Sequence, residues 1–234
     1  MKRPRLKRIT RLLMSDQTAN QDTPPIDDLH SPVGASVVRE GKLVQLRKHT
    51  EDNREPFVRW YADPEIAQLL RHDLEPLSRR EAIAYFSNII LPLSERGQCW
   101  AIHRRDTGNL IGTAAVTDLS AVRNTCLYRI VIGEKDAWGK GFGTETTRLV
   151  AQEVFENFPV TRFRLEVFAH NPRARRAYER VGFRQYDRYE ERVPAKNTVL
   201  DIIAMELTPD ALASNMPMAS GSDANEQDDA GSNR

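Results

Sequence analysis

The stretch CLYRIVIGEKDAWGKGFGTETTRLVAQEVFEN, residues 126–157, decides the fold of this chain. Its first part, Cys126–Ile132, is rich in β-branched and aromatic residues, which suit a covered β-strand. Its last part, together with Phe158, repeats apolar side chains at the spacing of one helical face. The stretch therefore predicts a buried strand, a glycine-rich turn and an amphipathic helix.

The turn, Trp138–Thr144, has glycine at positions 139, 141 and 143, directly before the predicted helix. Glycine lets backbone N–H groups approach a ligand closely, and a helix N-terminus attracts anions through its unpaired N–H groups and its dipole. The spacing therefore predicts a phosphate-binding loop. A glycine turn without any ligand is the alternative that these residues leave open.

Two other phosphate-binding loops fit the spacing less well. A Walker loop requires Ser or Thr after its Gly-Lys pair, but Gly141 follows Lys140 here. A dinucleotide-binding loop requires a small residue three positions after its second glycine, where this chain has Thr144 or Thr146. Glu166 does lie where such a fold places its ribose-binding acid, so a dinucleotide-dependent oxidoreductase stays as the weaker alternative.

The composition is that of a soluble globular protein: 40% of the 234 residues are apolar, 29% are charged, and the net charge is +1. Residues 1–34 are basic and residues 209–234 are acidic, and neither has apolar periodicity, so we predict two disordered tails around one domain at 35–208. Cys99 and Cys126 suggest no disulfide framework. With no apolar span or signal-peptide core, we expect a cytoplasmic protein.

Periodicity and turn residues predict the other elements. Before the central stretch they indicate a strand or short hairpin within 37–47 and two short helices separated at Asp63-Pro64. A third helix is predicted to begin at the capping box Ser78–Glu81 and to end at Pro92. Paired strands are predicted at 99–103 and 110–116. After the central stretch they indicate a strand at 163–168 parallel to Cys126–Ile132, a basic helix between Asn171-Pro172 and Gly182, and strands at 184–193 and 198–207.

Taken in order, the strand, WGKGFGT, the helix, the next strand and NPRARRAYERVGF resemble the GNAT superfamily of acetyl-CoA-dependent N-acetyltransferases. The chain looks most like the branch of ribosomal-protein alanine and spermidine acetyltransferases, over residues 42–208. The family loop, R/Q-x-x-G-x-G/A, falls on Trp138–Gly143, and Trp138 departs from it at the first position. The resemblance implies an α/β fold: a twisted mixed sheet of about seven strands, helices on both faces, and a central parallel pair splayed for acetyl-CoA.

The resemblance also implies the site. Backbone amides of the glycine loop would hold the coenzyme A pyrophosphate: Trp138, Gly139, Lys140, Gly141, Phe142, Gly143 and Thr144. The strand edge at Ile130, Val131 and Ile132 would pair with the pantetheine arm, which Asn171 would also contact. Tyr178 matches the tyrosine that protonates the departing thiolate. Glu166 matches a general base of some relatives, although it could equally pair with a nearby arginine, and His170 is a further candidate base.

The implied reaction moves an acetyl group from acetyl-CoA to a primary amine by direct attack in a ternary complex, without a metal. A non-catalytic acyl-CoA sensor or protein-interaction module is the alternative. The acceptor stays open between a polyamine, an aminoglycoside and a protein N-terminus, because the segment 50–77 carries both acids (Asp63, Glu65, Asp73, Glu75) and arginines (Arg54, Arg59, Arg71). A membrane is not an expected partner, because no stretch is apolar enough to span one. Nucleic acid is not expected either, because no aromatics accompany the basic start. A homodimer stays open.

Overall fold

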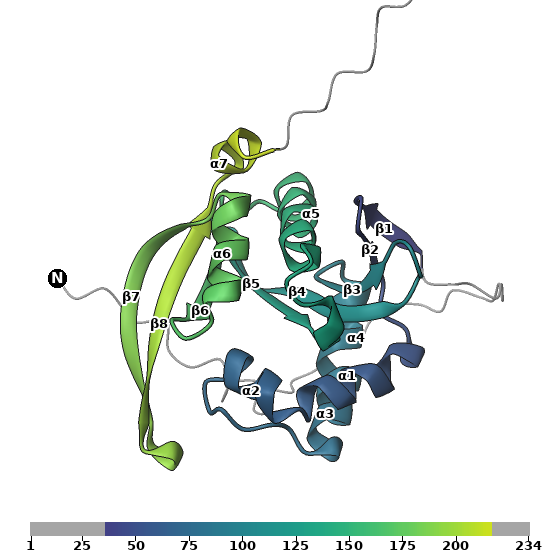
Figure 1. Ribbon diagram of the computed structural model, residues 1–234. Coiled ribbons are helices and arrows are strands. Elements are labelled where there is room, and N and C mark those ends of the chain that lie inside the picture. The colour runs from purple at the N-terminus through teal and green to yellow at the C-terminus, as the bar shows by residue number, and fades with distance from the viewer. Residues whose placement is uncertain (1–35, 217–234) are drawn as a thin grey trace, which may run out of the picture.

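The computed structural model describes residues 36–216. The predicted N-terminal tail, and the predicted C-terminal tail from residue 217 onward, lie outside these residues. Helices α5 and α6 cover one face of a twisted sheet, and α1–α4 lie on the other face (Figure 1). The α/β class and the helices on both faces are therefore confirmed.

The sheet has eight strands in the order β1-β2-β3-β4-β5-β6-β8-β7. Every neighbouring pair is antiparallel except β5 and β6. The expected number was about seven, and the additional strand arises because residues 37–47 form the hairpin that the sequence allowed. The strands are β1 Val37–Glu40, β2 Val44–Arg47, β3 Cys99–Arg104, β4 Leu110–Ser120, β5 Thr125–Ile132, β6 Arg162–Phe168, β7 Arg184–Val193 and β8 Thr198–Leu207.

The predicted capping residues are found at the helix ends. The capping box at Ser78 and Glu81 forms, and Asn171 and Gly182 bound the basic helix as its N-terminal and C-terminal caps. The α-helices are α1 Arg54–Tyr61, α2 Pro64–Leu70, α3 Arg79–Tyr85, α4 Leu91–Glu95, α5 Phe142–Asn157, α6 Pro172–Val181 and α7 Pro209–Ser214.

The parallel pair at the centre of the sheet is joined only at one end. Residues Thr125–Leu127 of β5 pair with Arg162–Arg164 of β6. Beyond this point β5 continues to pair with β4 as far as Ile132, whereas β6 pairs with β8. The two strands therefore separate after Leu127, which is the splayed centre that the family resemblance implied, and the separation opens a slot between them.

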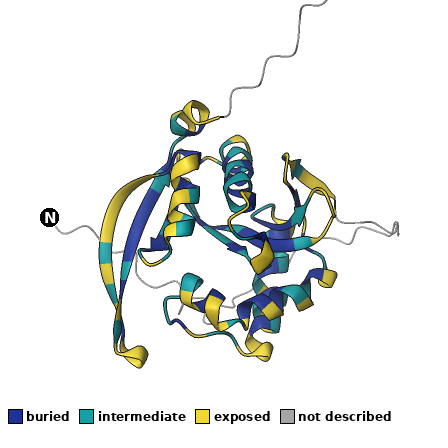
Figure 2. Cartoon of the chain, viewed as in Figure 1, coloured by how far each residue is buried: buried dark blue, intermediate teal, exposed yellow. Residues whose placement is uncertain are grey.

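Two apolar clusters hold the layers together. Val150 and Val154 of α5 are fully buried in a cluster that includes Phe163 of β6. Phe57 and Trp60 of α1 belong to a second cluster under α1 and α3, on the opposite face. Figure 2 shows buried residues concentrated in the central strands and on the inner sides of the helices. The core therefore fixes α5, and with it the glycine loop, against the splayed strands.

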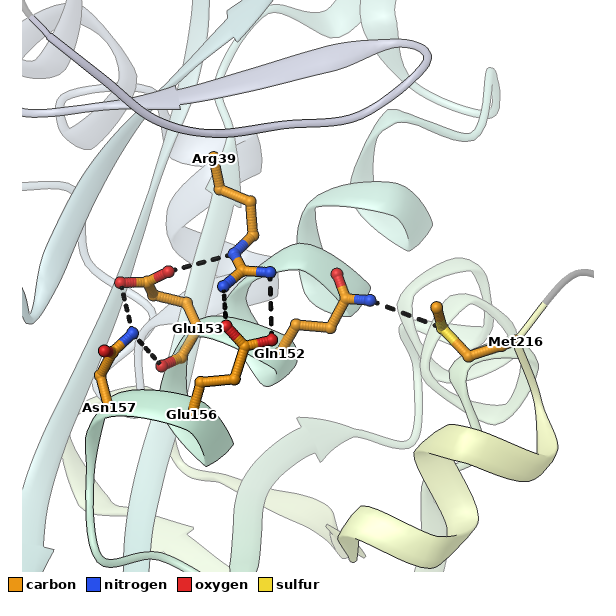
Figure 3. A network of polar contacts seen from close by, with 6 residues as sticks. All are labelled: Arg39, Gln152, Glu153, Glu156, Asn157 and Met216. Atoms are coloured by element: carbon orange, nitrogen blue, oxygen red, sulfur yellow. Dashed lines mark hydrogen bonds and ion pairs between the residues drawn. The ribbon is translucent and has the colours of Figure 1, made fainter. Parts of the chain in front are cut away.

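The hairpin of β1 and β2 is fastened to α5 by polar contacts. The Glu145 carboxylate in the first turn of α5 accepts hydrogen bonds from the backbone N–H groups of residues 42, 43 and 44, at 2.9, 2.6 and 2.8 Å. One turn from the other end of α5, Arg39 Nε lies 3.0 Å from Glu153 Oε2, and the Arg39 guanidinium also pairs with Glu156 (Figure 3). The hairpin therefore braces both ends of the helix that carries the loop.

Two expected boundaries are wrong. The helix expected to end at Pro92 continues to Glu95, because a π-turn at Phe86–Ile90 precedes the proline and Leu91 N–H donates to the Phe86 carbonyl. In a regular α-helix the proline ring would clash with the backbone carbonyl four residues earlier, and the wider π-turn moves that carbonyl away.

Order was also expected to stop at residue 209, yet α7 occupies Pro209–Ser214. Thr208 caps α7 by accepting a hydrogen bond from Ala211 N–H, and Leu212 is buried on the main cluster. Both cysteines are buried and free. Within residues 36–216, no helix is long and apolar enough to cross a membrane.

Candidate active site

The N-terminus of α5 is open to a ligand. Gly141 is its N-cap, with φ 90°, and no side chain caps the first turn. Gly139 has φ 77°, so both glycines adopt a left-handed conformation that other residues reach only at a cost of about 1–2 kcal/mol. The first N–H groups of α5 are therefore unpaired donors at the positive end of a 16-residue helix.

The glycine loop forms one end of a cleft that continues between β5 and β6. Trp138, Gly139, Gly141, Gly143 and Thr144 line this cleft, as do Ile130, Val131, Ile132, Glu166, Asn171 and Tyr178. Lys140 and Phe142 do not line it. Lys140 is exposed, whereas Phe142 is buried in the main cluster, with the Arg104 guanidinium over its ring. Their contribution to a phosphate site would therefore be confined to the backbone.

The strand edge predicted to bind pantetheine has a more specific arrangement than expected. Trp138 Nε1 donates a hydrogen bond to the Ile132 carbonyl at 2.7 Å, so this carbonyl faces the slot. The Val131 carbonyl lies instead against Gly112 of β4, where a Cβ would come within 2.2 Å of it. Main-chain groups point to alternate sides along a strand. The main-chain N–H and C=O groups of Ile130 and Ile132 therefore face the slot, whereas those of Val131 face β4.

Arg173, the second residue of α6, places its guanidinium carbon 3.8 Å from the centroid of the Trp138 ring. This cation–π contact holds a positive charge beside the glycine loop. Arg173 also lines the cleft. The sequence showed that α6 is basic but gave no signal that selected Arg173 from its neighbours.

Two further predicted residues sit at the start and in the last turn of α6. Asn171 caps the helix by accepting a hydrogen bond from Ala174 N–H at 3.2 Å, and it also lines the cleft, so the two expected roles are compatible. Tyr178 is only 9% exposed and reaches the cleft from the same helix. Burial raises the pKa of the Tyr178 hydroxyl well above its usual value, so it stays protonated at neutral pH.

Glu166 meets partners other than the arginines that the sequence suggested. Its Oε1 accepts a hydrogen bond from the Tyr189 hydroxyl at 2.7 Å, and its Oε2 lies 3.8 Å from His72 Nε2. Burial and the neighbouring Glu166 charge raise the pKa of Tyr189, so its hydroxyl is a stable donor. His72 lines the cleft, although sequence reasoning missed it because nothing local distinguishes it.

His170, the other candidate base, is outside the cleft. It is exposed, and its Nε2 lies 2.8 Å from the Gln68 carbonyl, to which it must donate. Its other nitrogen, Nδ1, keeps a lone pair, but the ring is not among the residues that line the cleft, so it does not face the acceptor. The structure therefore places His170 as a residue that ties β6 to α2.

The four acids considered above for a cationic acceptor, Asp63, Glu65, Asp73 and Glu75, are all paired. Lys135 Nζ lies 2.8 Å from Asp63 and 2.6 Å from Glu65, Arg71 binds Asp73, and Lys196 Nζ lies 2.5 Å from Glu75. Glu166 is the single acid among the residues that line the cleft, alongside Arg129, Arg173, Arg180 and His72. In the described part of the chain, no group of three or more His, Cys, Asp or Glu could hold a metal ion.

Comparison with known proteins identifies the class. The family described as the acetyltransferase (GNAT) domain matches residues 44–184, which is more than half of the chain. The chain therefore belongs to the GNAT family and is an acetyl-CoA-dependent N-acetyltransferase. This membership, with a sheet that is mostly antiparallel, excludes the dinucleotide-dependent oxidoreductase.

Three relatives illustrate the similarity. The uncharacterized N-acetyltransferase YoaA of Bacillus subtilis (strain 168) is 28% identical over 168 residues, which cover 68% of this chain and 92% of YoaA. The spermidine N-acetyltransferase of Vibrio cholerae, solved with CoA and spermine, is 18% identical with a TM-score of 0.62, covering 73% of this chain and 98% of its own. AAC(6')-Ib, solved with ribostamycin and coenzyme A, is 19% identical with a TM-score of 0.58, covering 75% and 99%.

Proposed function

We propose that this enzyme binds acetyl-CoA along the cleft and transfers the acetyl group to a primary amine by direct attack in a ternary complex. One observation carries the proposal: the uncapped N-terminus of α5 opens onto the slot between the splayed strands, and Tyr178 reaches that slot. Unpaired N–H donors at a helix N-terminus suit a pyrophosphate, and Arg173 adds a nearby cation. Two of the relatives with the same fold were solved with coenzyme A.

The chemistry needs a group that removes a proton and a group that supplies one. The amine nitrogen must be neutral before its lone pair forms the bond to the acetyl carbon, and the carbon–sulfur bond then breaks to release a thiolate. Tyr178, which stays protonated, is suited to give the thiolate its proton. Glu166, which lines the slot from β6, is suited to draw the proton from the acceptor, directly or through a neighbouring group.

We further propose that the acceptor is the α-amine of a protein or peptide N-terminus rather than a polyamine. A polyamine carries several positive charges and needs several unpaired acids, but the cleft offers only Glu166 among its described lining residues. Ile66, Leu69 and Leu70 line the same region and suit an apolar first side chain. An α-amine, with a reference pKa of ~7.7–8.0, also starts closer to its reactive form than a lysine-like amine at ~10.4.

Calorimetry with coenzyme A tests the cofactor site. Gly141→Val would place a branched side chain at the N-cap of α5 and should abolish measurable binding. Gly97→Val is the matched control, because Gly97 also has a positive φ (70°) and open space around it but lies outside the cleft. Gly143→Ala should bind nearly normally, because Gly143 lies in the helix and its nearest neighbour is at 3.8 Å. Unchanged affinity of Gly141→Val would place the site elsewhere.

Thiol release from acetyl-CoA tests the reaction and its acceptor. A peptide with a free N-terminal alanine should be acetylated with a higher kcat/KM than spermidine or kanamycin. Faster turnover of spermidine would contradict the proposed acceptor but leave the transferase proposal standing. Coenzyme A binding without turnover of any amine would favour the non-catalytic sensor instead.

A further inference from the structure

We propose that His72 is a further catalytic residue, whose Nε2 takes the proton that the acceptor amine loses before it attacks the thioester. This inference rests on the proposed function and adds the group that completes its base. His72 lies just after α2, in the segment that forms the acceptor side of the cleft, and it lines the cleft together with Glu166 and Tyr178. It is brought there by the fold, since its partner Glu191 is 119 residues away in sequence.

The contacts of His72 leave one ring nitrogen available. Its Nδ1 lies 2.9 Å from Glu191 Oε2, so in the neutral ring Nδ1 carries the proton and donates it to that carboxylate. Its Nε2 then keeps the lone pair and faces Glu166 Oε2 at 3.8 Å. The ring packs edge-on against Phe168, with centroids 5.4 Å apart, which fixes this orientation. The arrangement is that of an oriented base.

The gap between His72 and Glu166 has the size that an acceptor nitrogen requires. A separation of 3.8 Å is too long for a hydrogen bond between the two groups. An acceptor nitrogen between them can therefore lie about 2.8–3.0 Å from His72 Nε2 and from Glu166 Oε2 at the same time. The other Glu166 oxygen is occupied by Tyr189, which leaves Oε2 to receive the ammonium. The acceptor would therefore touch a carboxylate that attracts it and an imidazole that deprotonates it.

The charges around His72 favour the approach of the acceptor. Glu191 and Tyr189 face it from β7, Glu166 faces it from β6, and its own segment contributes the Arg71–Asp73 pair. Two carboxylates therefore flank one imidazole and attract the positive charge of the acceptor ammonium. The cations Arg129 and Arg180 line the same cleft and oppose this attraction.

The protons balance without another reactant. The ammonium loses two protons on becoming the amide: one passes to His72 Nε2 and then to solvent, and the other replaces the proton that Tyr178 gives to the thiolate. An imidazole is also a better match than a carboxylate for this task. Model imidazole titrates near pH ~6.5 and a model glutamate near ~4.3, so proton transfer from an α-amine is about 100-fold less unfavourable to the imidazole.

The first test compares two histidines that contact the same phenylalanine. His72→Gln keeps a donor for Glu191 but cannot accept the proton, and it should lower kcat/KM for an N-terminal alanine peptide about 10²- to 10⁴-fold near pH 7. Coenzyme A affinity should not change. His170→Gln is the matched control: His170 also stacks on Phe168, at 5.3 Å, but lies outside the cleft, and its variant should keep full activity. Full activity of His72→Gln would overturn the proposal.

The second test separates chemistry from packing. A hydrazide analogue of the peptide presents a weakly basic nitrogen that is already neutral near pH 7 and needs no base. The His72→Gln defect should shrink to less than about tenfold with this acceptor, whereas a structural defect would be equal for both. Glu191→Gln, which leaves Nε2 in place but weakens its orientation, should cost less than His72→Gln. Equal losses with both acceptors would overturn the proposal.

A third measurement does not depend on turnover. If the unaltered enzyme acetylates no amine, the proposed function is wrong, and the role of His72 is then tested separately by peptide binding. The His72 ring resonances should still move in carbon-13 spectra when the alanine peptide is added to the enzyme with coenzyme A bound, and those of His170 should not. Peptide binding that leaves the His72 resonances in place would overturn the inference.

Discussion

The indole N–H of Trp138 donates a hydrogen bond to the Ile132 carbonyl at 2.7 Å. This bond joins the glycine loop to the end of β5 at the point where β5 has separated from β6. The same indole ring carries the Arg173 guanidinium on its face. One side chain therefore connects the loop, the splayed strand and α6. The resemblance to the family gave no reason to expect this, because Trp138 is where the chain departs from the family loop.

Trp138→Phe keeps an aromatic face for Arg173 and removes the hydrogen bond. We expect the free energy of unfolding to fall by about 0.5–1.5 kcal/mol, the usual net worth of one hydrogen bond, as measured by urea denaturation. Coenzyme A affinity should fall several-fold, because the loop is less well positioned. If calorimetry shows unchanged affinity alongside unchanged stability, the bond has no role in positioning the loop.

Tyr178→Phe keeps the ring and its packing and removes the proton donor. Turnover should fall about 10²- to 10⁴-fold when chemistry limits the rate, while the melting temperature and coenzyme A affinity stay near those of the unaltered enzyme. Tyr186→Phe is the control, because Tyr186 is exposed on β7 and does not line the cleft. Undiminished turnover of Tyr178→Phe would show that the tyrosine only packs α6 on the sheet.

His49 should make the fold sensitive to acid. It is 7% exposed, its Nε2 lies 2.9 Å from Thr113 Oγ1, and burial lowers its pKa to about 4. Between pH ~6.5 and 4 the unfolded chain binds a proton that the folded chain does not, so stability present at neutral pH is lost as the pH falls through this window, by about 3 kcal/mol in total.

Urea denaturation of the unaltered chain and of His49→Gln, at pH 7.5 and 4.5, isolates this contribution. The carboxylates titrate in both proteins, so they cancel in the comparison. His49→Gln should be less stable at pH 7.5 but should lose about 2–3 kcal/mol less on acidification. Equal losses in the two proteins would show that His49 is not the group responsible.

Leu212 should stabilise the domain even though it lies in the region expected to be a tail. It is 7% exposed and packs on the main cluster, so Leu212→Ala should lower the free energy of unfolding by about 2 kcal/mol. Met216→Ala is the control: Met216 is 43% exposed, and its side chain accepts only a weak polar contact from Gln152, at 3.6 Å, among the described residues (Figure 3). Equal effects of the two variants would show that α7 does not contribute to the core.

The sequence by itself determined most local elements and the glycine turn that opens α5. The Ser78 and Glu81 capping box, the Asn171 cap and the glycines at 139 and 141 act through bonds within a few residues, so residue types and spacing are enough to predict them. The order of strand, loop, helix and strand then predicted the parallel pair of β5 and β6. The boundary at Pro92 failed because the π-turn before the proline lets the helix continue. The boundary at Pro209 failed because Thr208 and Pro209 start a new helix whose Leu212 packs on the main cluster.

Only the tertiary structure decided which charged groups meet. Glu166 could equally have been a base or the partner of a nearby arginine, and it lies between Tyr189 and His72. Asp63, Glu65, Asp73 and Glu75 are paired with Lys135, Arg71 and Lys196. Many charged side chains could form such pairs, and nothing in the sequence near either partner ranks the choices. The selection is made when distant elements pack around one core, and it places His72 beside Glu166, the one acid among the described residues that line the cleft.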